Sequence, residues 1–154
     1  MRLDWKVTAS VPLGGTISIP GDKSVSHRAL MFGALAEGTT TVRAFLNGAD
    51  CLATLRAVES LGARVERLDS THLRIHGLGG APLRSPPHEL DLGNSGTSMR
   101  LFCGLLAGRQ VNARLIGDAS LSSRPMRRVL DPLAQMGARI ESTGSGMAPL
   151  HIQP

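Results

Sequence analysis

An internal repeat is the feature of this chain that most constrains its fold. Residues 61–66 read LGARVE and residues 136–141 read MGARIE, and the segment LRIH at 73–76 has a counterpart, LHIQ, at 150–153. The first pair is offset by 75 residues (136 minus 61). A repeat of this length indicates one supersecondary unit that is used twice.

A second pair of segments repeats upstream with nearly the same period. Gly21 is followed seven residues later by Arg28, and Gly93 is followed at the same spacing by Arg100. This pair is offset by 72 residues (93 minus 21), so small insertions separate the two periods. Each unit therefore contains a glycine turn with an arginine after it and a closing pair of strands. The predicted units cover residues 12–80 and 81–154.

Apolar periodicity and turn residues predict the order βαβαββ in the first unit. Its first helix is expected to bury a stripe formed by Val25, Ala29, Phe32 and Ala36. Asp50 is expected to cap the second helix. The elements are predicted at residues 16–19, from Ser24 to about Gly38, and at 39–45, 50–61, 63–68 and 71–76.

The second unit predicts the same order of elements. Pro125 suits the first position of its second helix, and Met126, Leu130 and Leu133 lie at the spacing of one buried face. Alternating strands and helices predict an α/β fold of the layered α+β type, in which the helices pack together beneath a sheet. The elements are predicted at residues 89–92, 97–107, 110–116 and 125–136, followed by two strands, with residues 77–87 as the connector.

The basic charge of the chain is made almost entirely of arginine. The formal net charge is +5, and 15 of the 17 basic residues are arginine, while the chain has three Phe, one Trp and no Tyr. Aromatic platforms for stacking bases are therefore nearly absent, and no nucleic-acid partner is expected. Arginine suits the bidentate recognition of carboxylate and phosphate groups. A nucleic-acid-binding module remains an alternative that rests on the basic charge alone.

The sequence also bears on compartment and metal content. No apolar run approaches the ~18 residues of a membrane span, and Asp4 and Lys6 interrupt the segment where a secretory signal would be apolar. Cys51 and Cys103 are 52 residues apart with no CxxC motif. We therefore expect a cytoplasmic chain with no membrane partner, no disulfide and no metal site.

Residues 21–24 (GDKS) form the first candidate site, because they lead into a predicted helix whose free N–H groups would bind an anion. Lys23 adds a positive charge there. Arg28 lies one turn after Ser24 on the same face, and helical side chains tilt toward the N-terminus. The three side chains are therefore expected to converge on one anion.

Two further segments are candidate anion sites. Residues 92–100 (LGNSGTSMR) join a strand to a helix through two glycines, and Arg100 is a lone charge in an apolar helix start. This is neither a nucleotide P-loop nor a GxGxxG turn. In residues 117–126, Arg124 directly precedes a predicted helix. A cation is unfavourable at a helix N-terminus, so its presence there indicates an anion that binds both the arginine and the helix start. No Ser-His-Asp set, HExxH motif or spaced carboxylate pair accompanies them, so the sequence predicts anion binding without a complete catalytic set.

These segments resemble the signature segments of the 5-enolpyruvylshikimate-3-phosphate (EPSP) synthase family, the transferases inhibited by glyphosate. The matching residues are 20–30, 92–100 and 117–126. The resemblance implies the inverted α/β fold of enolpyruvyl transferases, with two domains of three βαβαββ units each. This chain would supply two units of an N-terminal part, and residues 1–11 would be a strand segment of the other domain.

The resemblance also implies roles for individual residues. Lys23, Ser24 and Arg28 would bind shikimate 3-phosphate, and Lys23, Gly96 and Arg124 would bind phosphoenolpyruvate. The reaction would transfer the enolpyruvyl group to the 5-hydroxyl and release phosphate, in the biosynthesis of chorismate and aromatic amino acids, without metal or organic cofactor. No catalytic residue would lie in this chain, which alone would be inactive without its missing C-terminal part. Further residues expected nearby are Asn94, Thr97, Arg100 and Asp50.

The chain departs from the family pattern at a few positions. Asp22 and His27 replace the Ser and Asn of many members, and Asp22 places a negative charge beside Lys23 that would weaken phosphate binding. Gly96 is unsubstituted, which implies glyphosate sensitivity. The sister family of UDP-amino-sugar enolpyruvyl transferases is an alternative, but its members would carry a reactive cysteine in a mobile loop, whereas Cys103 falls in a predicted helix.

Overall fold

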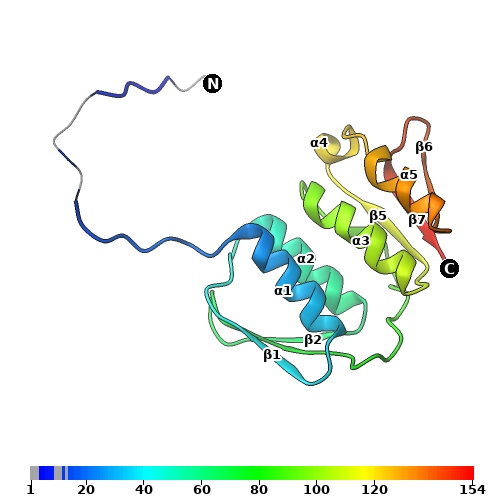
Figure 1. Cartoon of the computed structure of the whole chain (residues 1–154), viewed down its shortest axis with the longest axis horizontal. Helices are drawn as coiled ribbons and strands as arrows, with labels where there is room; N and C mark the ends of the chain where they lie inside the picture. The colour runs from blue at the N-terminus through cyan, green and yellow to red at the C-terminus, as the bar shows by residue number, and fades with distance from the viewer. Residues whose placement is uncertain (1–3, 9–11, 13) are drawn as a thin grey trace.

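The computed structural model describes residues 4–8, 12 and 14–154. Its elements follow the predicted order except that the first predicted strand is absent and one short helix, α4, is added (Figure 1). The helices are α1 (Lys23–Leu35), α2 (Ala49–Ser60), α3 (Gly96–Gly108), α4 (Ala119–Ser122) and α5 (Arg127–Gln135). The strands are β1 (Thr39–Val42), β2 (Arg64–Arg67), β3 (Leu73–His76), β4 (Leu90–Asp91), β5 (Ala113–Ile116), β6 (Arg139–Thr143) and β7 (Met147–Gln153).

The two sheets share one topology. The first sheet has the order β1-β3-β2 and is antiparallel throughout. The second has the order β4-β5-β7-β6, in which β5, β7 and β6 are antiparallel neighbours and β4 pairs with β5 in parallel. The second sheet therefore repeats the first and adds one strand. This confirms the α/β fold and the repeated supersecondary unit.

The predicted strand at residues 16–19 does not form. These residues are extended but unpaired, and Ile17 and Ile19 are 82% and 77% exposed. Their counterpart β4 pairs with β5 and has Leu90 buried there. In Figure 1 the N-terminal segment instead leads away from both sheets. A strand needs a ladder partner and an apolar surface beneath it, and no described residue supplies both to this segment.

The assignment of residues 1–11 to a strand segment of the other domain stays a prediction. Residues 4–8 have no regular secondary structure. The rest of that segment, residues 1–3 and 9–11, lies outside the described residues.

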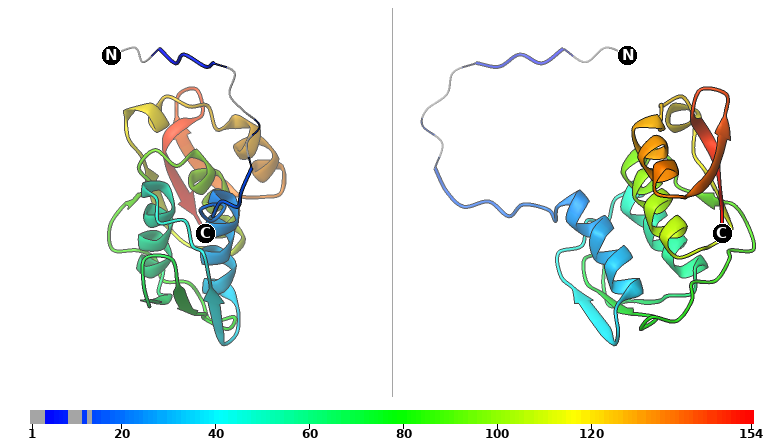
Figure 2. Two further views of the ribbon diagram at one scale, coloured as in Figure 1. Left: turned by 90° about the vertical axis from the view of Figure 1, so that its left-hand side faces the viewer. Right: turned by 45° about the vertical axis from the view of Figure 1, so that its right-hand side comes forward.

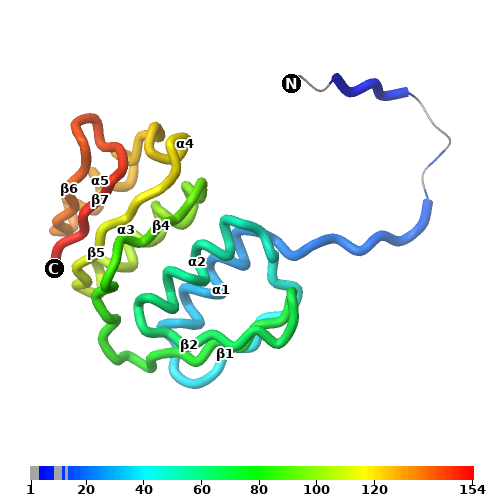
Figure 3. Tube along the Cα trace, turned by 180° about the vertical axis from the view of Figure 1, so that it is seen from behind, coloured from blue at the N-terminus to red at the C-terminus, as the bar shows by residue number. Residues whose placement is uncertain are grey.

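The helices of the two units lie against one another, with the sheets on their outer sides. Figure 1 shows the first sheet on one side of α1 and α2 and the second sheet beyond α3, and Figure 3 shows the same layers from behind. Alternate residues of β3, Leu73 and Ile75, point into the core and are fully buried. One continuous apolar core includes Phe45 of the first unit and Phe102 of the second. Burial of this apolar surface is the main driving force for the packing.

The predicted buried stripe of the first helix is wrong. Val25 and Phe32 are 55% and 67% exposed, and the face of α1 that contacts the core carries His27, Leu30 and Met31 instead. Both faces of this helix are apolar at helical spacing. Periodicity alone therefore could not decide which face is buried.

Some helix starts also differ from the sequence predictions. Asp22, one residue before α1, accepts a hydrogen bond from the Val25 N–H at 2.7 Å and so caps the helix. Asp50 lies in the first turn of α2 but does not cap it. Pro125 precedes α5 by two residues instead of starting it. The expected apolar face of α5 is confirmed, since Met126 and Leu130 are buried.

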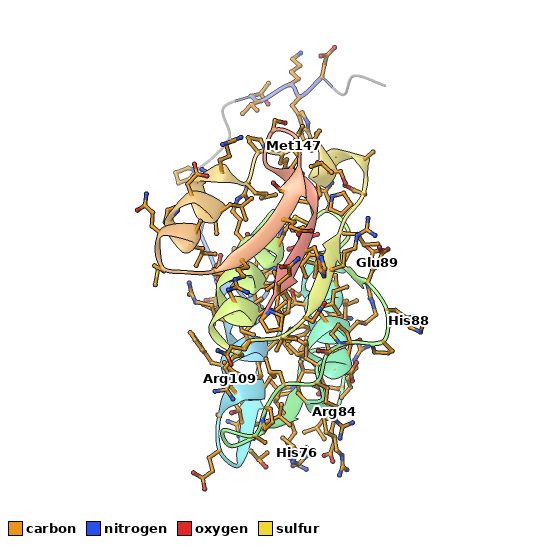
Figure 4. The ribbon with its side chains drawn as sticks, turned by 90° about the vertical axis from the view of Figure 1, so that its right-hand side faces the viewer. His76, Arg84, His88, Glu89, Arg109 and Met147 are labelled. Carbon is orange, nitrogen blue, oxygen red and sulfur yellow. The ribbon has the colours of Figure 1, made fainter. Side chains whose placement is uncertain are left out.

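The connector between the units is tied to both of them. The Arg84 N–H donates to the Leu61 carbonyl at 2.9 Å. From the second unit, the guanidinium of Arg109 donates to the carbonyls of Gly80 and Ala81 at 3.3 and 3.0 Å. Figure 4 labels Arg84 and Arg109 on this side of the molecule. The connector is therefore a fixed part of the fold, although it contains no helix or strand.

Gly21 is required by a close approach of two backbone segments. A Cβ atom at this position would lie 1.7 Å from the carbonyl oxygen of Ala44. We expect Gly21→Ala to lower the free energy of unfolding by about 3 kcal/mol or more, because the clash is with backbone. Chemical denaturation measures this. Gly104→Ala in α3 is the matched control, since no atom lies within 4 Å of its Cβ, and it should raise stability by roughly 0.5–1 kcal/mol.

The turn between β2 and β3 makes stability depend on acid pH. Asp69 accepts hydrogen bonds from the N–H groups of Thr71 and His72, at 2.6 and 2.9 Å, and these hold the pKa of its carboxyl at about 2. Because the folded pKa is depressed, the carboxylate stabilises the chain above pH ~4, and this contribution is lost as the pH falls toward 2. Asp69→Asn should therefore be less stable than the parent at pH 7 and equally stable at pH 2. A constant difference between these pH values would contradict this.

Candidate anion site at the helix starts

The first turn of α1 is held by side-chain hydrogen bonds. The hydroxyl of Ser26 donates to the Asp22 carbonyl at 2.8 Å and accepts from the Leu46 N–H at 3.0 Å. The turn is thus tied to the loop between β1 and α2. The carboxylate of Asp22 is occupied by its capping bond. A capping hydrogen bond does not remove the charge of a carboxylate, so the expected negative charge of Asp22 next to Lys23 in sequence stands.

A second carboxylate, that of Asp50, forms an ion pair with the ammonium group of Lys23. The pair joins the first turn of α1 to the first turn of α2. The Lys23 side chain is still half exposed. An incoming anion therefore meets a cation whose position is fixed by a carboxylate behind it.

Ser24 and Arg28 lie beside this pair, on the solvent side of α1. Both are exposed, and Arg28 also lines an apolar groove of about 250 Å³ between α1 and α3. No described residue forms a salt bridge with Arg28. The sequence prediction that Ser24 and Arg28 share a face is confirmed, but their convergence on one anion stays a prediction.

The first turn of α3 forms the second part of the site. Ser95 caps the helix by accepting from the Ser98 N–H at 3.2 Å. Gly96, the first residue of α3, is buried, and its carbonyl accepts a hydrogen bond from the Arg100 guanidinium at 3.1 Å. Thr97 is exposed beside it. This turn therefore presents backbone and guanidinium groups together.

Asn94 holds Arg124 in place over this turn. The Asn94 amide nitrogen donates to both carboxylate oxygens of Asp118, at 3.1 and 2.8 Å. The Asn94 amide oxygen accepts from one guanidinium nitrogen of Arg124 at 2.5 Å. The same Arg124 nitrogen also donates to the Ser120 hydroxyl at 3.2 Å. The bond from Asn94 lowers the pKa of Asp118, so this carboxylate stays ionised. Asp118 also caps α4 by accepting from the Leu121 N–H at 2.7 Å. Its contact with Asn94, like that of Ser120 with Arg124, joins separate elements, and no role was predicted for either residue from the sequence.

Three arginines surround one open cavity at this place. Arg100, Arg124 and Arg128, with Pro125, line a cavity of about 440 Å³. Burial, together with the charges of Arg128 and Arg124, lowers the pKa of Arg100. A Cβ atom on Gly96 would lie 2.8 Å from Arg100 and 3.2 Å from Arg124. Mutual repulsion among cations is relieved by a bound anion, so this arrangement favours a phosphate or carboxylate.

The two helix starts lie next to each other. The Ser98 hydroxyl of α3 lies 3.2 Å from Nδ1 of His27 in α1, although the two residues are 71 positions apart in sequence. Figure 2 shows α1, α2 and α3 alongside one another. The structure therefore brings together two of the three predicted segments directly, and Asn94 brings in the third. Sequence analysis noted His27 only as a departure and assigned Ser98 no role.

The described residues also bear on metals, membranes and thiols. They contain no group of three or more His, Cys, Asp or Glu side chains that could hold a metal. Among them, no helix is both long and apolar enough to cross a membrane. Cys51 and Cys103 are free and buried. Burial raises the pKa of both thiols, that of Cys103 to about 12.

A tandem α/β protein with a candidate small-anion site at its helix starts is the class that this fold and site define. Residues 7–154 match the family of EPSP synthase (3-phosphoshikimate 1-carboxyvinyltransferase). The chain belongs to this family, which confirms the resemblance seen in its motifs.

Individual relatives agree with the family match. The chain is 51% identical over 153 residues to the 3-phosphoshikimate 1-carboxyvinyltransferase of Hydrogenovibrio crunogenus, covering 99% of this chain and 34% of that protein. It is 56% identical over 138 residues to the enzyme of that name from Methylococcus capsulatus, covering 90% and 32%. A solved structure of EPSP synthase from Acinetobacter baumannii superposes with a TM-score of 0.86 at 50% identity, again covering 90% and 32%. The chain spans about a third of the length of these relatives.

We expect both thiols to be unreactive in the folded protein, because the nucleophilic thiolate is disfavoured by burial. A chromogenic thiol reagent at pH 8 should label neither Cys51 nor Cys103 in buffer and both in denaturant. Fast labelling of Cys103 in buffer would contradict this assignment.

Proposed function

We propose that this chain supplies one side of the substrate site of a 3-phosphoshikimate 1-carboxyvinyltransferase. The enzyme transfers the enolpyruvyl group of phosphoenolpyruvate to the 5-hydroxyl of shikimate 3-phosphate and releases phosphate. In this proposal Lys23, Gly96 and Arg124 bind phosphoenolpyruvate, and Lys23, Ser24 and Arg28 bind shikimate 3-phosphate.

The observation that carries the proposal is the placement of Arg124. Its guanidinium is fixed by Asn94 beside Gly96, and Arg100 approaches the same glycine from the other side. The two guanidinium groups pack closely against a residue without a side chain, and together with Arg128 they line an open cavity of about 440 Å³ that can hold an anion. Phosphoenolpyruvate, with a phosphate and a carboxylate, has the charge that such a site requires.

The same geometry supports the proposal of further roles. Asn94 orients Arg124, and Asp50 orients Lys23 through their ion pair. Arg100 and Thr97 flank the helix start. The acid and base of the reaction belong to other parts of the enzyme, and we propose that this chain alone binds substrates without turnover, with no metal or organic cofactor taking part.

The proposed domain organisation follows the repeat. Residues 12–80 and 81–154 are two units of a domain that has a third, and residues 1–11 belong to the second domain. The exposed apolar side chains Val25, Phe32 and Leu101 on α1 and α3 support this, because surfaces of this kind are normally covered.

The alternatives are less well supported. A UDP-amino-sugar enolpyruvyl transferase would need a reactive cysteine, whereas Cys103 is buried in α3 and its thiol pKa is raised. A nucleic-acid-binding module rests only on the basic charge. Free thiols suit a reducing compartment, and we place the enzyme in the cytoplasm.

Binding is tested by titrating the chain with phosphoenolpyruvate and then with shikimate 3-phosphate, followed by amide-resolved NMR at fixed salt. Arg124→Ala should weaken phosphoenolpyruvate binding by about 10- to 100-fold, because it removes charge-assisted hydrogen bonds. Lys23→Ala should weaken binding of both ligands.

The matched controls are Arg139→Ala, on the exposed face of β6, and Lys6→Ala, which should leave both affinities unchanged. If the controls weaken binding as much as the site variants, the ligands bind by general charge attraction and the assignments are wrong.

A further inference from the structure

A cluster of buried polar side chains lies directly beneath the proposed site. Among the described residues, five polar side chains are almost completely buried, and Ser26 belongs to the α1 turn already described. The other four form one hydrogen-bonded group, here called the buried hydroxyl cluster. Its members are His27 of α1, Thr54 of α2, and Ser95 and Ser98 at the start of α3.

The distances within the buried hydroxyl cluster are those of hydrogen bonds. Nδ1 of His27 lies 2.8 Å from the Thr54 hydroxyl and 3.2 Å from the Ser98 hydroxyl. The Thr54 and Ser98 hydroxyls are 2.5 Å apart, and the Ser98 and Ser95 hydroxyls are 2.6 Å apart. The cluster therefore connects three helices through side-chain contacts alone.

One set of donors and acceptors satisfies the cluster when the Thr54 hydroxyl donates to His27, its nearer acceptor, and not to the Asp50 carbonyl at 3.3 Å. The Ser98 N–H donates to Ser95, whose hydroxyl donates to Ser98, then Ser98 to Thr54, and Thr54 to Nδ1 of His27. Nε2–H of His27 then faces the Cys51 sulfur at 3.9 Å. This arrangement uses a neutral imidazole. Burial and the nearby Lys23 lower the pKa of His27, and Asp50 opposes them.

Each member of the cluster is close in sequence to a residue of the proposed site. His27 lies four residues after Lys23, and Thr54 lies four residues after Asp50, so each is one helical turn below its partner. Ser95 and Ser98 flank the start of α3 at Gly96. The cluster is thus the point where the helix bearing Lys23 meets the helix bearing Gly96.

We propose that His27, Thr54 and Ser98 are positioning residues, which fix the first turn of α1 relative to that of α3 so that Lys23 and Gly96 form one anion site. This inference rests on the proposed function for the identity of the ligand. Apolar side chains could fill the same volume. Hydrogen bonds are directional, however, so the polar groups of the cluster all find partners in only one arrangement of the three helices.

The test removes the central hydroxyl of the cluster without changing the side-chain shape. Thr54→Val leaves the His27 ring and the Ser98 hydroxyl without a shared partner. Thr41→Val, at an exposed position of β1, is the matched control. His27→Asn places an amide atom near the position of Nδ1 and is the conservative variant. His88→Asn, on the exposed connector where Figure 4 labels this histidine, is its control.

Two measurements are made on each folded variant. Residual dipolar couplings of the backbone amides report the orientation of α1 relative to α3 without any ligand. Titration with phosphoenolpyruvate reports the affinity. We expect that the dipolar couplings of Thr54→Val no longer fit the single relative orientation of α1 and α3 found in the parent. We also expect this variant to bind phosphoenolpyruvate at least fivefold more weakly, the equivalent of about one hydrogen bond. His27→Asn should retain both properties, and the two controls should match the parent.

The inference is overturned if Thr54→Val is folded and matches the parent in helix orientation and affinity, because the cluster would then contribute only to stability. If the parent chain binds no phosphoenolpyruvate, the proposed function fails, and the dipolar couplings alone decide the inference. Even without ligand binding, the inference is supported if α1 and α3 lose their single relative orientation in Thr54→Val and keep it in Thr41→Val.

Discussion

The 3.2 Å contact between Nδ1 of His27 and the Ser98 hydroxyl joins residues that are 71 positions apart, and it marks where the two repeated units meet. Each unit alone carries one glycine turn that leads into a helix, α1 in the first unit and α3 in the second. A single helix start of this kind is a weak anion site. Packing α1 against α3 places two such starts side by side (Figure 2). In the proposed function, the repeat therefore creates a site that neither copy has by itself.

Positive charge at this site is held in place by acidic partners located behind it. Lys23 is paired with Asp50, and Arg124 reaches Asp118 through Asn94. Arg100 has its Nε atom buried without a hydrogen-bond partner, so its charge is only partly compensated within the described residues. Groups fixed before a ligand arrives lose little freedom on binding. The site is thus both preorganised and short of negative charge.

The sequence predicted the features that depend on local signals. Turn glycines and apolar spacing located most elements within a few residues, and the motifs around Lys23, Gly96 and Arg124 were recognised from their order. What failed depends on distant partners. Residues 16–19 have the pattern of a strand but no partner. Helix α1 has two apolar faces, and the buried one carries Leu30, whereas the face with Phe32 is exposed. The bond from Asn94 to Asp118 and the cluster around His27 join separate elements, and no local pattern encodes them.

The central claim is that one anion is bound jointly by the starts of α1 and α3. A crystal structure of this chain with phosphoenolpyruvate tests it most directly. We predict the ligand between the Lys23 ammonium and the Arg124 guanidinium, in contact with the backbone at Gly96. A ligand bound elsewhere, or bound by only one of the two helix starts, would contradict the account.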